Sequence, residues 1–177
     1  MAGMAAVTLV LGGARSGKSR YAESLIERGA GSCVYLATAE AGDEEMATRI
    51  AAHKDRRGPR WTTVEEPLEL ATALGRVATR EHGVLVDCLT LWLSNLLAAG
   101  RDPHRETEGL LAVLPVLGGP VVFVSNEVGQ GIVPANPLAR RFVDEAGRLH
   151  QALAAAADRV ILMTAGLPLT LKGASSS

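Results

Sequence analysis

The chain contains the run Gly12-Gly13-Ala14-Arg15-Ser16-Gly17-Lys18-Ser19, which fits the pattern G-x-x-x-x-G-K-[ST] of a phosphate-binding loop. Residues 7–11 before it are apolar and predict a buried strand, and residues 19–28 after it carry apolar side chains at helical spacing. The glycines let the backbone wrap so that successive N–H groups face an anion, with the helix N-terminus behind them. Lys18, one of three lysines in the chain, is expected to reach the β- and γ-phosphates, and the Ser19 hydroxyl to hold Mg²⁺. We therefore predict that the chain binds a nucleoside triphosphate.

Beyond this segment, short apolar runs that predict strands alternate with amphipathic stretches that predict helices. Further strands are expected at residues 33–37, 84–86, 120–124, 159–164 and 169–172. Further helices are expected at residues 43–57, 67–80 and 138–157 and in the apolar stretch that ends at residue 97. Residues 101–108 are polar and are expected to form a loose loop. The alternation predicts an α/β fold with a mostly parallel sheet, helices on both of its faces and a C-terminal antiparallel hairpin.

Length and composition narrow the class of protein. With 177 residues, the chain is expected to form a single nucleotide-binding domain over residues 1–177, with residues 1–5 and 173–177 as disordered tails. The formal net charge is −1 and aromatic residues make up 3% of the chain, which argues against a nucleic-acid-binding protein. The apolar runs are far shorter than the ~20 residues of a membrane-spanning helix. Cys33 and Cys88 lie in apolar runs, so we expect buried, reduced thiols in a cytoplasmic protein.

Two acidic residues follow predicted strands, at the sheet edge where ligands of such folds bind. Asp87 ends the strand at residues 84–86, from where it can orient Mg²⁺ or a water bound to it, although an Asp there also serves as a cap. Glu127 follows the strand at residues 120–124. It is a candidate base for the proton of a substrate hydroxyl, a candidate Mg²⁺ partner, or a residue that caps the loop. The residues alone leave these alternatives open.

One histidine lies among arginines near the end of the predicted helix at residues 43–57. His53 shares a helix face with Arg49, Arg56 and Arg57. A neutral imidazole can attack phosphorus and form a phosphoramidate, which splits one group transfer into two steps. A nucleophile and an incidental histidine on a solvated basic helix end both fit this pattern. The other histidines are expected at the surface: His82, His104 and His150.

Taken together, these segments resemble the bifunctional adenosylcobinamide kinase/adenosylcobinamide-phosphate guanylyltransferases of cobalamin biosynthesis. The resemblance runs from residue 7 to residue 172. Its specific parts are Arg-Ile-Ala-Ala-His at residues 49–53 and Ser-Asn-Glu-Val-Gly-Gln-Gly-Ile-Val-Pro at residues 125–134. The phosphate loop, Tyr-Leu-Ala-Thr-Ala at residues 35–39 and Asp87 also match.

The resemblance implies a RecA-like P-loop domain, a homotrimer and two successive reactions. The first phosphorylates the aminopropanol hydroxyl of adenosylcobinamide with a nucleoside triphosphate, ATP or GTP. The second transfers GMP from GTP onto adenosylcobinamide phosphate, which gives adenosylcobinamide-GDP and pyrophosphate. GMP passes through a covalent histidine intermediate in such enzymes, and the matching residue here is His53.

The resemblance also implies site residues. Independently of the resemblance, Lys18 and Glu127 are the other candidate catalytic residues, and Ser19 and Asp87 are the candidate Mg²⁺ ligands. The nucleotide-binding residues are residues 12–19 together with Ala37, Thr38, Ala39, Lys54, Asp55, Arg56, Arg57, Glu65 and Asp87. The chain departs from the family pattern in residues 101–108, which match nothing assigned, and in His150, where an Asn-like residue is expected. The nucleotide preference of the kinase step, the corrinoid-binding residues and the number of nucleotide sites stay undecided.

Three other functions compete with this interpretation. A small-molecule kinase without guanylyl transfer predicts that His53→Ala keeps full activity and that no covalent nucleotide forms. An ATP-driven RecA-like module predicts salt-dependent binding of polynucleotides. A nucleotide-binding switch or scaffold predicts no turnover with any corrinoid.

Overall fold

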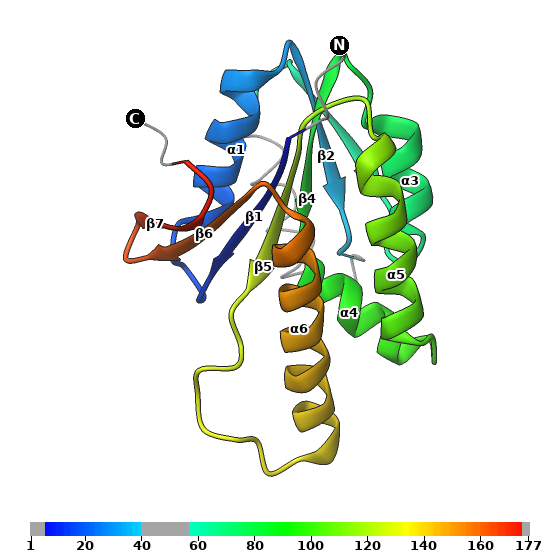
Figure 1. Cartoon of the computed structure of the whole chain (residues 1–177), viewed down its shortest axis with the longest axis vertical. Helices are drawn as coiled ribbons and strands as arrows, with labels where there is room; N and C mark the ends of the chain where they lie inside the picture. The colour runs from blue at the N-terminus through cyan, green and yellow to red at the C-terminus, as the bar shows by residue number, and fades with distance from the viewer. Residues whose placement is uncertain (1–5, 40–56, 175–177) are drawn as a thin grey trace.

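A seven-stranded sheet forms the centre of the computed structural model, which describes residues 6–39 and 57–174 (Figure 1). Its strand order is β3-β2-β4-β5-β1-β6-β7. The strands are β1 (Val7–Gly12), β2 (Ser32–Ala37), β3 (Trp61–Glu65), β4 (His82–Asp87), β5 (Val121–Asn126), β6 (Arg159–Thr164) and β7 (Leu167–Lys172). All neighbouring pairs are parallel except β6 and β7, which form an antiparallel hairpin. The predicted mostly parallel sheet and its C-terminal hairpin are confirmed.

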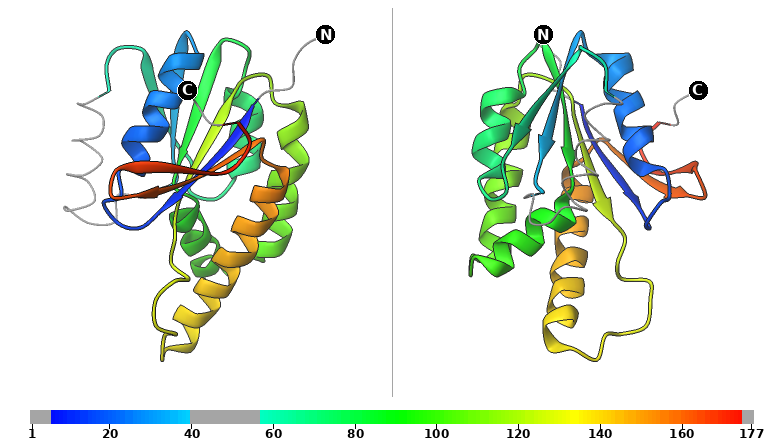
Figure 2. Two further views of the ribbon diagram at one scale, coloured as in Figure 1. Left: turned by 60° about the vertical axis from the view of Figure 1, so that its left-hand side comes forward. Right: turned by 180° about the vertical axis from the view of Figure 1, so that it is seen from behind.

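Helices cover both faces of this sheet, as predicted (Figure 2). The described helices are α1 (Lys18–Gly29), α3 (Leu70–Val77), α4 (Leu89–Ala98), α5 (Pro103–Val113), the short 3₁₀ helix η1 (Leu114–Val116) and α6 (Pro137–Ala156). On one face, Ala22 and Ile26 of α1 pack against Val10, Val122 and Ile161. The other helices cover the opposite face, where the fully buried Trp92 and Phe123 lie in the larger core cluster. None of the helices described is long and apolar enough to cross a membrane. Cys33 and Cys88 are buried and free of disulfides, as expected.

The strand register brings the carboxyl ends of five parallel strands to one edge of the sheet. Glu65 of β3 pairs with Ala37 of β2, which in turn pairs with Asp87 of β4. Asp87 pairs with Val124 of β5, and Asn126 two residues further pairs with Gly12 at the end of β1. Because these strands are parallel, the residues singled out in the sequence follow one another along this edge. Ligands of such sheets bind where the parallel strands end.

One expectation about secondary structure is wrong, and one strand was not expected. Residues 101–108 do not form a loose loop, because Pro103–Val113 is helical and the Asp102 carboxylate accepts a hydrogen bond from the His104 N–H at 3.0 Å. An Asp N-cap followed by Pro at the first helical position is a helix start signal that outweighs the polarity of the segment. β3 was not expected because Trp61–Glu65 has no apolar run, and it is a partly exposed edge strand that pairs only with β2 among the described strands.

Parts of the predicted organisation lie outside the described residues. They are the helix expected at residues 43–57 except its last residue, the tail at residues 1–5, and residues 175–177 of the C-terminal tail.

The expectation that His150 lies at the surface is also wrong. Its exposed fraction is 8%, and its Nε2 lies 2.7 Å from the hydroxyl oxygen of Ser125. His150 shares the sheet-facing stripe of α6 with Ala146, Leu149 and Leu153, which follow one another at helical spacing. Burial lowers the pKa of the His150 imidazole, and the nearby Glu127 carboxylate opposes that shift. The imidazole is therefore neutral in the folded protein at neutral pH.

We predict a pH-dependent contribution of His150 to stability. Its folded pKa is below the ordinary value of 6.5, so below that pH the unfolded chain binds more protons. The free energy of unfolding should therefore decrease as pH falls from about 7 toward 5. Urea unfolding across this range should give a flatter pH profile for His150→Gln than for the natural chain. Parallel profiles for the two proteins would contradict the assignment.

Candidate active site

The phosphate loop forms the turn between β1 and α1 and has the backbone of an anion-binding cradle. Gly17 is the N-cap of α1 and has a left-handed conformation with φ of 89°, which glycine adopts without strain. No side chain caps the N-terminus of α1, so its backbone N–H groups remain available to an anion. The turn between β6 and β7 supports the loop from the other side, because the Gly166 N–H donates to the Ser16 carbonyl at 3.0 Å.

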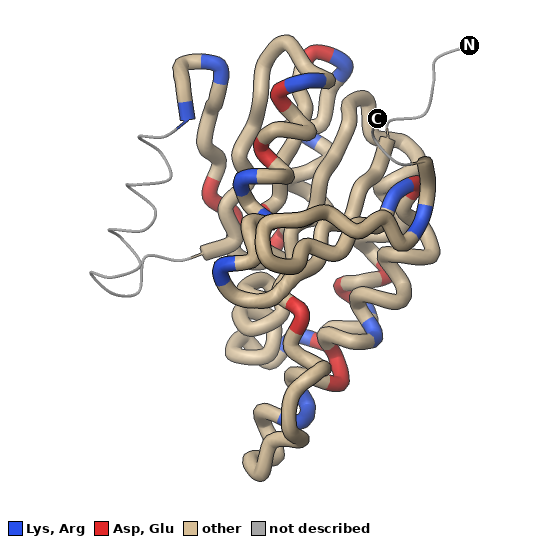
Figure 3. The backbone as a smooth tube through the Cα atoms, turned by 90° about the vertical axis from the view of Figure 1, so that its left-hand side faces the viewer, with Lys and Arg blue, Asp and Glu red and all other residues tan. Residues whose placement is uncertain are grey.

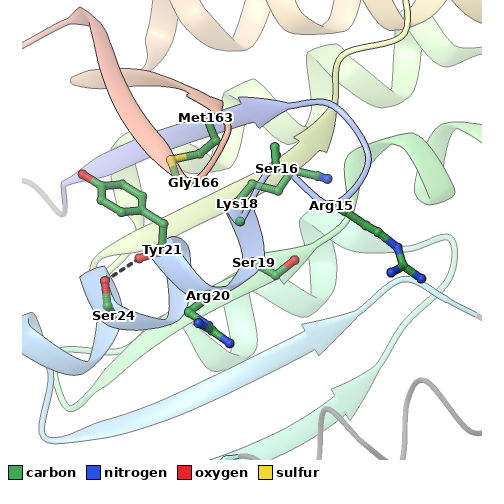
Figure 4. Close-up of a pocket in the computed structure, with 10 residues that line it drawn as sticks. Arg15, Ser16, Lys18, Ser19, Arg20, Tyr21, Ser24, Met163 and Gly166 are labelled. Atoms are coloured by element: carbon green, nitrogen blue, oxygen red, sulfur yellow. Dashed lines mark hydrogen bonds between the residues drawn. The ribbon is translucent and has the colours of Figure 1, made fainter.

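A pocket of about 910 Å³ opens on this loop (Figure 4). Its lining residues are Arg15, Ser16, Gly17, Lys18, Ser19, Arg20, Tyr21, Ser24, Met163 and Gly166. The lining holds three cationic side chains, and no carboxylate is found among its described residues. Lys18 folds back over the loop, where its Nζ donates to the Gly13 carbonyl at 2.9 Å. The pocket therefore presents backbone donors and positive charge, which suits a polyphosphate.

Asp87 contacts the first turn of α1 beside the phosphate loop. The Ser19 hydroxyl donates to Asp87 Oδ2 at 3.1 Å, and the Tyr35 hydroxyl donates to the same oxygen at 3.2 Å. Burial raises the pKa of the Tyr35 phenol far above its usual range, and the Asp87 charge adds to the shift, so the phenol stays a donor. A hydroxyl beside a carboxylate is a hard oxygen pair of the kind that Mg²⁺ uses together with phosphate oxygens and waters. The expected Mg²⁺ ligands, Ser19 and Asp87, thus lie within hydrogen-bond distance of each other.

The side chain of Arg57 is almost fully buried. It is 3% exposed, and its Nε donates to Glu23 Oε1 at 3.2 Å. Its guanidinium carbon lies 3.2 Å from the centroid of the Tyr35 ring. Neither η nitrogen finds a hydrogen-bond partner among the described residues. A buried guanidinium with unused donors fits a site that receives a phosphate. The expected site residues His53, Lys54, Asp55 and Arg56 lie outside the described residues.

Of the expected nucleotide contacts at the ends of β2 and β3, Thr38 is buried and Glu65 is exposed. The Thr38 side chain is buried and engaged, because its hydroxyl donates to the Cys88 carbonyl at 2.7 Å and accepts from the Cys88 N–H at 2.9 Å. It fixes the end of β2 to the start of α4, with Ala37 and Ala39 on either side of it. Glu65 is exposed at the end of β3, two strands from Asp87 and hence roughly 10 Å away across the sheet. The structure therefore does not bring Glu65 to the phosphate loop.

Glu127 lies beside the first residue of the loop. Its N–H donates to the Gly12 carbonyl at 3.0 Å, and its Oε1 accepts from the Gly129 N–H at 2.7 Å. The backbone of Glu127 is thus held next to the phosphate loop, while its carboxylate caps its own loop.

Sequence reasoning missed the roles of two side chains at this edge. Tyr35 contacts both Asp87 and Arg57, and Asn126 donates to the Thr90 hydroxyl at 2.9 Å. A hydrogen-bonding side chain near the carboxyl end of a buried strand was the available signal for both. Neither spacing nor composition indicates which neighbour such a side chain meets.

Comparisons with known proteins give consistent results. A family model described as cobinamide kinase / cobinamide phosphate guanyltransferase matches residues 8–171. The bifunctional adenosylcobalamin biosynthesis protein CobP of Pseudomonas aeruginosa is 54% identical over 168 residues, covering 93% of this chain and 96% of that protein. The bifunctional adenosylcobalamin biosynthesis protein CobU of Salmonella typhimurium is 43% identical over 179 residues, covering 93% and 98%.

Solved structures with the same fold have little sequence in common with this chain. The P4 protein from bacteriophage phi6, in complex with ADP, has a TM-score of 0.50 at 16% identity. A prototypical ATPase from a bacterial type III secretion system has a TM-score of 0.58 at 12% identity. The chain covers 52% and 51% of these structures, so it spans about half of their length. The likeness supports the P-loop fold.

We predict that Gly12→Ala weakens triphosphate binding. A Cβ at Gly12 would lie 2.5 Å from the Ser16 hydroxyl oxygen and 2.8 Å from the Met163 carbonyl oxygen, so the loop must shift. Overpacking of this kind costs about 1–3 kcal/mol, so the Kd of a GTP analogue should rise roughly tenfold or more. Calorimetric titration with Mg²⁺ present would measure it. Gly29→Ala is the control, because a Cβ there meets nothing within 4 Å. Equal Kd values for both variants would contradict the cradle geometry.

Proposed function

The chain belongs to the cobinamide kinase / cobinamide phosphate guanyltransferase family, and from this membership we propose that it catalyses both reactions. It phosphorylates the aminopropanol hydroxyl of adenosylcobinamide with ATP or GTP, and it then transfers GMP from GTP onto adenosylcobinamide phosphate. The observation that carries the proposal is the phosphate loop with Asp87 Oδ2 3.1 Å from the Ser19 hydroxyl. We propose that a single domain performs both steps.

In the kinase step, this chain's own residues hold the triphosphate and accept a proton. The α1 N-terminus and the loop N–H groups bind the phosphates, and Lys18 leaves the Gly13 carbonyl for the β- and γ-phosphates. Ser19 and Asp87 would hold Mg²⁺, which neutralises charge on the phosphates when bound. The Glu127 carboxylate takes the proton of the substrate hydroxyl while the hydroxyl oxygen forms the bond to the γ-phosphorus. The nucleoside diphosphate leaves.

In the guanylyl step, an imidazole nitrogen of His53 attacks the α-phosphorus of GTP and pyrophosphate leaves. A phosphate oxygen of adenosylcobinamide phosphate then attacks the same phosphorus, the phosphoramidate bond breaks, and adenosylcobinamide-GDP forms. The two buried η nitrogens of Arg57 support a contact with the transferred phosphate, since they find no partner among the described residues. Lys54, Asp55 and Arg56 belong to the same proposal through the family pattern.

We further propose that the protein forms a homo-oligomer, which the family resemblance suggests is a trimer. We also propose that it works in the cytoplasm. Residues 160–171 of the β6–β7 hairpin carry no charge (Figure 3). Leu167, Leu169 and Leu171 are 71%, 57% and 56% exposed and alternate along β7, so they lie on one face of this strand. An exposed apolar row of this kind is typical of an interface between subunits. Two buried cysteines without a disulfide suit a reducing compartment.

We predict a covalent GMP adduct on His53. The protein is incubated with Mg²⁺ and GTP labelled at the α-phosphate or at the γ-phosphate, and is then denatured at alkaline pH for intact mass. An adduct of GMP mass should carry only the α-label, disappear in acid and be absent from His53→Ala. His104→Ala is the matched control, because the His104 side chain is 75% exposed on α5.

Two results would overturn the guanylyl step. One is triphosphate binding without any adduct, together with phosphoryl transfer to adenosylcobinamide, which indicates a kinase only. The other is an adduct that persists in His53→Ala, which places the nucleophile elsewhere.

A further inference from the structure

Five side chains form a connected series of contacts beside the phosphate loop. Ser19 and Tyr35 both donate to Asp87 Oδ2, at 3.1 and 3.2 Å. The Tyr35 ring stacks on the Arg57 guanidinium at 3.2 Å, and Arg57 Nε donates to Glu23 at 3.2 Å. Ser19 and Glu23 are four residues apart on α1, so they lie on the same face of that helix, and the series of contacts begins and ends there.

Strand register and helix α1 determine the positions of these five side chains. Tyr35 pairs with Leu85 and Ala37 with Asp87 in the register of β2 and β4, so Tyr35 lies on the neighbouring strand two positions before the carboxylate. Residues two apart along a strand face the same side of a sheet, which brings the phenol beneath the carboxylate. The α1 helix crosses this side of the sheet, so Ser19 reaches Asp87 at one end of the series and Glu23 reaches Arg57 at the other.

Tyr35 connects Asp87 to Arg57 through two different contacts. Its hydroxyl reaches Asp87, which the proposed function assigns to the kinase step, and its ring reaches Arg57, which the same proposal assigns to the transferred GMP phosphate. Arg57 has one planar surface against the ring and one donor on Glu23, so its orientation is determined from two directions. A buried guanidinium whose charge is compensated in this way keeps its η nitrogens in a fixed position.

We propose that Tyr35 is a positioning residue shared by the two steps. Its hydroxyl orients Asp87 for phosphoryl transfer, and its ring orients Arg57 for guanylyl transfer. The inference rests on the proposed function, since it uses the roles given there to Asp87 and Arg57. It adds that one side chain serves both steps through two separable contacts.

Two substitutions at Tyr35 separate these contacts. Tyr35→Phe removes the hydrogen bond to Asp87 and keeps the stacked ring, so kcat for phosphorylation of adenosylcobinamide should fall roughly tenfold, with the nucleotide KM changed less. The rate of GMP-adduct formation from α-labelled GTP should stay within about twofold. Tyr35→Leu removes both contacts, so both rates should fall. Equal effects of the two substitutions on both rates would indicate a packing role only and overturn the inference.

Arg57→Lys tests the stacked contact without changing Tyr35. Lysine keeps the positive charge but has no planar surface for the ring, so the rate of adduct formation should fall by a larger factor than the kinase kcat. Arg105→Lys on the exposed part of α5 is the matched control. An unchanged adduct rate in Arg57→Lys would overturn the stacking half of the inference, whether or not Tyr35→Leu folds.

The two proposals fail in different ways. If the natural chain forms no GMP adduct, the guanylyl half of the proposed function fails, and Tyr35→Phe still tests the kinase half of the inference through its kcat. If the natural chain forms the adduct and Tyr35→Phe phosphorylates adenosylcobinamide at the natural rate, the proposed function stands and the inference is wrong.

Discussion

The hydrogen bond between Ser19 and Asp87 joins the two parts of the nucleotide site. Ser19 lies in the first turn of α1, which follows β1 and the phosphate loop, and Asp87 ends β4, which is separated from β1 by β5. The contact exists because α1 leaves the loop and crosses β5 and β4 on this side of the sheet. The packing of one helix therefore decides whether a hydroxyl and a carboxylate meet where a triphosphate and Mg²⁺ are expected to bind.

The parallel register extends this arrangement along the whole edge. The carboxyl ends of β3, β2, β4, β5 and β1 align there, so polar side chains from distant parts of the sequence become neighbours without any long loop. Two chemistries can then share one edge, with Glu127 beside the phosphate loop and Arg57 on the far side of Tyr35. Buried charges at this edge are compensated locally, as Glu23 compensates Arg57.

The sequence predicted the parts of the fold that depend on local pattern. The phosphate loop, its flanking strand and helix, Asp87 and the C-terminal hairpin follow from apolar runs and glycines, which act over a few residues. Prediction from the sequence was wrong or incomplete where tertiary contacts determine the structure. The burial of His150 depends on which face of α6 meets Ser125, β3 exists because β2 offers an edge, and the Tyr35 contacts depend on register between strands. The start of α5 was a missed capping signal at Asp102 and Pro103.

In the proposed guanylyl step, GMP passes to the corrinoid through a covalent bond to the protein itself. The direct measurement is a chase: protein carrying α-labelled GMP is freed of nucleotide and mixed with adenosylcobinamide phosphate. The account predicts that label leaves the protein and appears in adenosylcobinamide-GDP in equal amount, without added GTP. Label that stays on the protein in this chase, while a parallel sample supplied with unlabelled GTP still forms adenosylcobinamide-GDP, would contradict it.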